Sequence, residues 1–401
     1  MSSPGPTSAL NAPPHRPDIP FVIPVEVPFV VRAPRRVRVV RAVIGGLGSA
    51  WEWVFGTLTL MAGLAVLAAI PVLQFLSLGY LLEVGGRVGR SGRLRDGFIG
   101  VRPAARVGSI VLGAYLMLLP LQLVSSLWTS AELIEPGGRV ARGWRIALGM
   151  LTIVMALHIA LACARGGRLR YFLWPFGNPF WLARRLARGG YYAEARDAVW
   201  EFLVALRLPY YFWLGLRGFV GGFLWIAVPV TLLAAGRKIP PLGVLGWVLL
   251  VAVLLYVPFL QVHFAVRNRF RALFELRAVR DLYRRAPWAF AWSLLITLAF
   301  ALPLYLLKIE MIPREAAWLP SLVFIAFIFP ARLLIGWGYG LATRRPAPRH
   351  GFFRWTGRLA MLAVAAAYGV VVYFSQFVAW GGIWSLYEQH AFLLPVPFFS
   401  M

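Results

Sequence analysis

Long uncharged stretches of apolar residues alternate along the chain with short segments rich in arginine. Each apolar stretch has at least about the 20 residues that an α-helix needs to cross the hydrocarbon core of a bilayer. We therefore predict an all-α fold, a polytopic transmembrane helical bundle with about eight membrane segments. The predicted segments are 53–82, 107–128, 146–164, 218–235, 242–266, 287–307, 316–341 and 359–380.

The first of these segments leaves the side of the N-terminus open. It lies between Glu52 and Glu83, is longer than one crossing requires, and contains Pro71, which should kink or break a helix. A single crossing puts the N-terminus outside, whereas the arginines between residues 32 and 41 favour the cytoplasmic side. A bent hairpin over about residues 42–82, broken near Pro71, would keep both ends inside.

The arginine-rich connecting segments set the predicted orientation. Basic loops stay in the cytoplasm, so segments 85–106, 165–217, 267–285 and 344–358 are predicted to lie on that side. Residues 170–207 and 267–285 mix apolar residues with arginine, which is typical of amphipathic interfacial helices. The partners expected there are membrane lipids, whose anionic headgroups would contact Arg87, Arg90, Arg184, Arg185, Arg269 and Arg271.

Composition agrees with a membrane location. The 401 residues are 60% hydrophobic and only 14% charged, whereas about a quarter of the residues in a soluble domain are charged. A net charge of +26 is typical of nucleic-acid-binding proteins, but the arginines here separate apolar runs, so no nucleic-acid partner is expected. A single cysteine, Cys163, excludes an internal disulfide framework.

The two ends differ from the middle of the chain. Residues 1–34 contain a proline every few positions before any apolar run, which predicts a disordered or extended tail and no secretory signal. We assign residues 35–385 to one helical transmembrane domain and residues 386–401 to a C-terminal tail.

Polar residues inside the apolar runs are the candidate functional positions, because placing a polar group inside a bilayer costs free energy. Arg332 would either extend to the inner headgroups or contact an anion or lipid phosphate. His158 and His263 would form hydrogen bonds between helices or, with Cys163, hold a metal or carry protons. The spacing of known metal motifs is missing, so no metal site and no cofactor are expected. Gln74 and Gln261 are placed to cap backbone groups freed by neighbouring prolines.

A short pattern recurs along the chain. Pro71 precedes Gly79 and Tyr80 by the same offset as Pro330 precedes Gly338 and Tyr339, with arginines following, and Pro258 occupies a similar place. This predicts a repeated helix pair joined by a basic elbow. Glycines that would let helices approach closely are Gly79, Gly221, Gly222, Gly336, Gly338 and Gly340.

The stretch IPVLQFLSLGYLLEVGGRVGRSGRLRDGF, followed by a second span ending in YLMLLP, resembles bacterial polytopic membrane proteins of the uncharacterised DUF4013 type. The resemblance covers about residues 50–125. It implies an α-helical integral membrane protein and does not imply an activity.

From these observations we expect a multi-pass protein of the bacterial cytoplasmic (inner) membrane. The favoured role is a non-catalytic scaffold or accessory component of the cell envelope, with a membrane-protein partner; no enzymatic motif is present. The alternative is a carrier or permease for a lipid or small amphiphile, with a cavity near Arg332, His158 and His263. A membrane-embedded enzyme is the third hypothesis.

Overall fold

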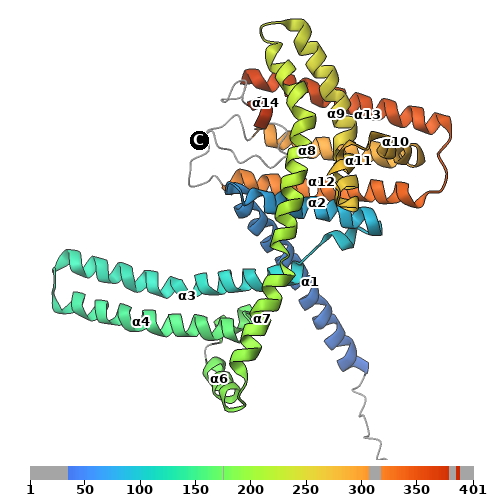
Figure 1. The fold of residues 1–401 in the computed structure, drawn as a ribbon. Helices are drawn as coiled ribbons and strands as arrows, with labels where there is room; N and C mark the ends of the chain where they lie inside the picture. The colour runs from blue at the N-terminus through green and yellow to red at the C-terminus, as the bar shows by residue number, and fades with distance from the viewer. Residues whose placement is uncertain (1–34, 175, 307–317, 379–384, 389–401) are drawn as a thin grey trace, which may run out of the picture. The chain divides into compact units, whose positions relative to one another are not determined.

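The computed structural model describes residues 35–174, 176–306, 318–378 and 385–388, and every regular element in these ranges is helical (Figure 1). The predicted tail 1–34 and residues 389–401 of the predicted C-terminal tail lie outside the described residues. The elements are α1 (Arg35–Ala69), α2 (Gln74–Ser91), η1 (Leu94–Gly97), α3 (Val101–Ile134), α4 (Arg139–Ala164), α5 (Leu169–Leu173), α6 (Gly177–Ala187), α7 (Tyr191–Ala205), α8 (Leu208–Ala235), α9 (Pro240–Arg267), η2 (Phe270–Phe274), α10 (Leu276–Arg285), α11 (Pro287–Leu306), α12 (Trp318–Arg344), α13 (Gly351–Val378) and α14 (Ser385–Glu388).

Contacts divide the chain into two units, Met1–Gly48 and Ser49–Met401, with the border inside α1. The described part of the first unit is the helical stretch before Ser49. The packing described below belongs to the second unit.

Eight helical stretches of the described chain are long and apolar enough to cross a membrane. They are Gly48–Ala69, Val101–Ile134, Arg139–Ala164, Tyr191–Ala235, Pro240–Arg267, Pro287–Leu304, Leu319–Arg344 and Gly351–Val378. This confirms the prediction of an all-α polytopic bundle with about eight segments. Several helices extend beyond the predicted segments. The predicted segments end where arginines lower the hydropathy, but arginine has a high helix propensity, so the helical backbone continues through it.

The predicted stretch 53–82 is two helices rather than one. Helix α1 ends at Ala69 and α2 begins at Gln74, with Pro71 in the turn between them. Val72 adopts the left-handed backbone conformation, with φ of 68°, so the chain turns sharply there. The predicted break near Pro71 is therefore confirmed, and the spanning part of this stretch ends at Ala69.

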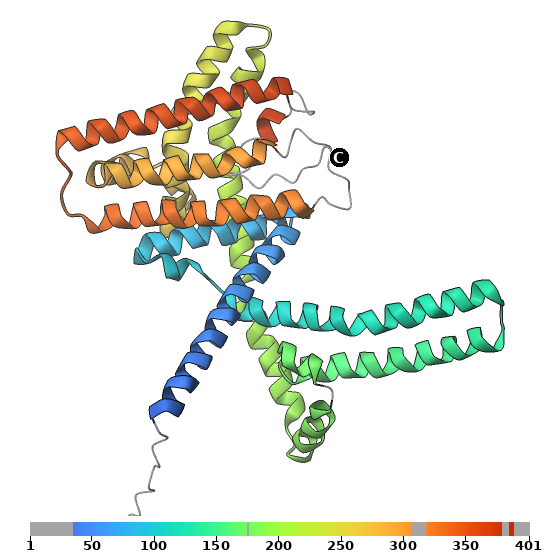
Figure 2. The same ribbon diagram turned by 180° about the vertical axis from the view of Figure 1, so that it is seen from behind.

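Helices α3 and α4 form an antiparallel hairpin (Figures 1 and 2). Only 11% and 6% of their most apolar windows are buried. Large side chains such as Leu123 and Met150 are more than half exposed. In water such surfaces would drive association, whereas in a bilayer they face acyl chains. Lipid is therefore the medium that fits this hairpin.

Helix α2 lies at the centre of the most tightly packed region and contacts α8, α9 and α12. Leu81, Val84 and Val88 of α2 are completely buried. Glycines allow the helix backbones to touch, as predicted: Gly79 packs on the backbone of Tyr211, and Gly336 packs on Gly85. Helices α11, α12 and α13 lie side by side next to this region (Figure 2).

The proline of the predicted repeat does not have the same place in each copy. Pro258 and Pro330 lie inside α9 and α12, whereas Pro71 lies in the turn before α2. The tyrosines differ too: Tyr80 donates to the carbonyl of Ile99, and Tyr339 pairs with His263. The helix-pair repeat is therefore not matched in these details.

Candidate functional site

Arg332 and Gln261 meet in the protein interior. Arg332 is a charged residue near the middle of α12, and only 2% of its surface is exposed. Its Nη1 donates a hydrogen bond of 2.6 Å to Oε1 of Gln261, a fully buried residue of α9. Arg332 therefore does not extend to the headgroups. A buried guanidinium needs such acceptors, since an unsatisfied charge in a low-dielectric interior is very costly.

His263 joins α9 to two further elements. Its Nε2 lies 2.8 Å from Oε2 of Glu275, at the start of α10, and its Nδ1 lies 2.8 Å from the hydroxyl of Tyr339 on α12. A carboxylate can only accept, so Nε2 carries the hydrogen that points to Glu275. When the ring is neutral, Nδ1 has no hydrogen and the hydroxyl of Tyr339 donates to it. This chain of hydrogen bonds fixes the end of α9 against α12 and the connecting segment after it. It matches the hydrogen-bonding hypothesis for His263.

The hydrogen bond from His263 lowers the pKa of the Glu275 carboxyl, with further contributions from Arg269 and Arg267. The folded protein thus holds fewer protons here than the unfolded chain does. The stabilisation is complete above the ordinary pKa of about 4.3 and is lost as the pH falls through the lower pKa of the folded state.

In detergent unfolding measurements from neutral to acid pH, Glu275→Gln should lack this acid-dependent loss of stability. Glu201→Gln, which removes a carboxyl from α7, should retain it; identical profiles for the two variants would contradict the assignment.

Glu83 is a buried carboxylate that joins α2 to α8. Its Oε1 accepts from Arg90 at 2.6 Å and from Arg87 at 3.2 Å, and its Oε2 accepts from the hydroxyl of Tyr210 at 2.8 Å. Arg90 also donates to the backbone carbonyl of Ala265 on α9. Three helices are held by this one cluster. Glu83, Arg87 and Arg90 lie on α2, the same helix that supplies the glycine contacts to α12.

His158 and Gln74 lie apart from these clusters. His158 on α4 pairs through Nε2 with the carbonyl of Phe172 at 2.8 Å, which ties α4 to α5. Gln74 begins α2, and its buried Oε1 has no hydrogen-bond partner within the described residues. Across the described chain no group of three or more metal-ligating side chains comes together. The structure therefore brings together one pair of the predicted intramembrane residues, Arg332 with Gln261, and gives His263, His158 and Gln74 separate surroundings.

The arginines predicted to contact headgroups fall into two groups. Arg87 and Arg90 are partly exposed but pair with Glu83, and Arg185 pairs with Glu194 on α7. Arg184, Arg269 and Arg271 are exposed on α6 and around η2. The exposed members remain free to meet lipid, whereas the paired ones already have a carboxylate partner.

Sequence reasoning did not select Glu83, Glu275 or Tyr339 as site residues. Glu83 had a signal, since it is an acidic residue followed by Arg87 and Arg90 at helical spacing, where side chains on one face meet. Tyr339 was marked only as part of the recurring Gly-Tyr pattern, and Glu275 had no signal, because both contact His263 from other parts of the fold.

These observations define the class of the protein: it is a multi-pass α-helical integral membrane protein with hydrogen-bonded polar clusters between its helices. Comparison with protein families, characterised proteins and solved structures found no match.

Proposed function

We propose that the chain is a non-catalytic scaffold or accessory component of the bacterial cell envelope, resident in the cytoplasmic membrane and in contact with anionic phospholipid and a membrane-protein partner. The observation that carries the proposal is that Arg332, Glu83 and His263, which are buried between helices, are each engaged with side chains of other elements. Arg332 forms a hydrogen bond with Gln261, and Glu83 forms hydrogen bonds with Arg90 and Tyr210. His263 forms hydrogen bonds with Tyr339 and Glu275. Residues used in this way hold helices together. The resemblance to the DUF4013 type is compatible with this role and remains a prediction.

The carrier hypothesis needs Arg332, His158 and His263 around one cavity. These residues lie on α12, α4 and α9, and His158 has a partner of its own on α5. Arg332 and His263 are each only 2% exposed. This arrangement favours the scaffold over the carrier.

The test is reconstitution of the purified full-length chain into liposomes that contain a fluorescent phospholipid. We expect lipid movement between leaflets at the rate of protein-free vesicles, and an assembly larger than the lone chain after mild extraction from its native membrane. A lone monomer that accelerates lipid movement, with the acceleration abolished in Arg332→Met, would overturn the proposal in favour of the carrier.

A further inference from the structure

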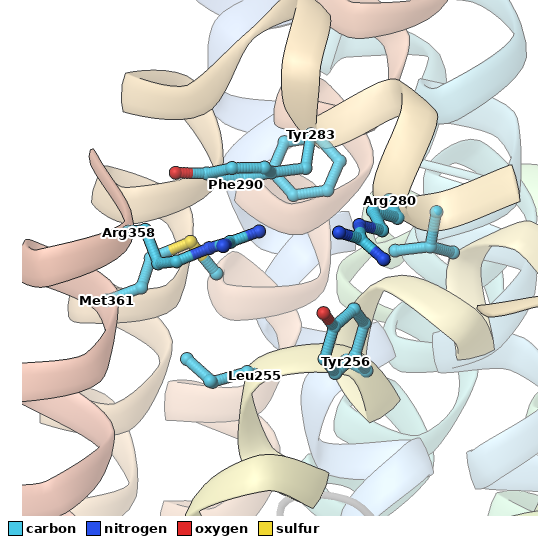
Figure 3. A pocket seen from close by; sticks show the side chains of 8 residues that line it. Leu255, Tyr256, Arg280, Tyr283, Phe290, Arg358 and Met361 are labelled. Atoms are coloured by element: carbon cyan, nitrogen blue, oxygen red, sulfur yellow. The ribbon is translucent and has the colours of Figure 1, made fainter. Parts of the chain in front are cut away.

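A cavity of about 30 Å³ lies where α9, α10, α11 and α13 converge, and two arginines point into it (Figure 3). Arg280 of α10 and Arg358 of α13 face each other across the cavity, with Tyr256 of α9 beside them. Apolar side chains, including Phe290 and Met361, form the remaining wall. The volume admits one small group, since a water needs roughly 10–15 Å³ and a drug-sized ligand roughly 300 Å³ or more.

The positive charge at this cavity is not neutralised by a neighbouring carboxylate. Within the described residues neither Arg280 nor Arg358 forms an ion pair. Asp281, next to Arg280 in sequence, pairs instead with Arg284. Both arginines are exposed to solvent, so an anion can reach them. An oxyanion between the two guanidinium groups would receive charge-assisted hydrogen bonds from both sides.

The cavity lies near the N-terminal ends of α11 and α13. Phe290 lies three residues after the first residue of α11, and Arg358 lies seven after that of α13. At the rise of an α-helix these offsets are about 5 and 10 Å from the helix ends. Exposed Trp288 and Trp355 lie at the same helix ends, where tryptophan marks the membrane interface.

We propose that this cavity binds the phosphate of an anionic phospholipid, with Arg280 and Arg358 as the two donors. The glycerol and acyl chains remain outside, along the apolar surfaces of α11 and α13. Phospholipid is favoured over free phosphate because the cavity lies near the helix ends that carry the exposed Trp288 and Trp355. This deepens the lipid contact in the proposed function by naming its site. None of the six arginines that the sequence selected for headgroup contact lines it.

The test measures binding of short-chain phosphatidylglycerol to the delipidated full-length chain in detergent, by native mass spectrometry and by thermal shift. Arg280→Gln with Arg358→Gln should weaken binding about a hundredfold, since each of the two charge-assisted contacts contributes about a tenfold change in affinity. The charge-matched control is Arg142→Gln with Arg145→Gln, two exposed arginines of α4 outside the cavity, and it should bind as the unmodified protein does. Diacylglycerol, which lacks the phosphate, should not bind at this site.

Met361→Phe provides a second variant that retains both arginines while narrowing the cavity, and it should also weaken binding. Equal losses in the two double variants, or unchanged binding in both Met361→Phe and the cavity double variant, would overturn the site. Inorganic phosphate that displaces phosphatidylglycerol at equal concentration would show that the site takes a free anion and would overturn the lipid assignment. Lipid movement in the liposome assay is a separate readout, so the site and the scaffold role can fail independently.

Discussion

Replacing Gly336 with valine is expected to lower the free energy of unfolding by about 3 kcal/mol, the upper part of the range for overpacked interiors. A Cβ at this position would lie 2.5 Å from the carbonyl oxygen of Gly85 and 3.0 Å from Cβ of Val88. Both are parts of α2 that cannot rotate away as a flexible side chain can. Helix α12 would have to move off α2, and the neighbouring contact of Gly340 with Val88 and Gly89 would open with it. Unfolding by SDS titration in mixed micelles, followed by circular dichroism, measures the loss.

Gly149→Val on α4 is the matched control for this prediction. It makes the same chemical change within an apolar helix, but no described atom lies within 4 Å of the added Cβ. The control should unfold close to the unmodified protein. If the two variants lose similar amounts, helix propensity rather than the contact between α2 and α12 governs the effect.

Only half of this contact could be predicted from the sequence. Gly336 and Gly340 are spaced four residues apart in an apolar run, which is the pattern of a helix-packing face. The other half, Gly85 and Gly89, lies on α2 among arginines. There the sequence favours a loop at the membrane surface over a face that packs against another helix. Which glycines meet depends on the register between helices far apart in sequence, and no local pattern encodes that register.

The helix boundaries show a related difference between sequence and structure. The apolar run predicts a span that starts at residue 218, whereas α8 starts at Leu208. Arg217, inside this helix, donates to Oδ1 of Asn268 at 2.9 Å. Hydropathy ends a segment where charge begins, but the backbone hydrogen bonds continue as long as the charged side chains find partners or solvent. The spans themselves were predictable because bilayer thickness sets their length.

The candidate site was also predictable only in part. Arg332 stands out as a charge inside an apolar run, so its importance is visible in the sequence, but its partner is not. The sequence predicts that Gln261 caps the backbone near Pro258, whereas in the structure its side-chain oxygen accepts a hydrogen bond from Arg332. A residue type indicates that a partner is needed, and only the fold selects which one.

Gln261→Leu is expected to lower the free energy of unfolding by about 2 kcal/mol, the value of a hydrogen bond to a charged group. The variant leaves the guanidinium of Arg332 buried on α12 without the acceptor that α9 supplied. Arg332→Met should lower the free energy of unfolding less, by about 1 kcal/mol, because it removes the charge that needs the acceptor. The group that then loses a hydrogen-bond partner is the neutral side-chain amide of Gln261. Methionine fills a similar length and packs adaptably.

The double variant Gln261→Leu with Arg332→Met completes the thermodynamic cycle. Because both changes remove the same hydrogen bond, the combined loss should be smaller than the sum of the two single losses. The same SDS titration measures all three variants. Additive losses would show that the two residues act independently, and an Arg332→Met protein as stable as the unmodified one would mean that this arginine does not hold α12 to α9. In that second case a role in binding a ligand becomes the better account of a buried arginine, and the liposome assay on the same variant decides it.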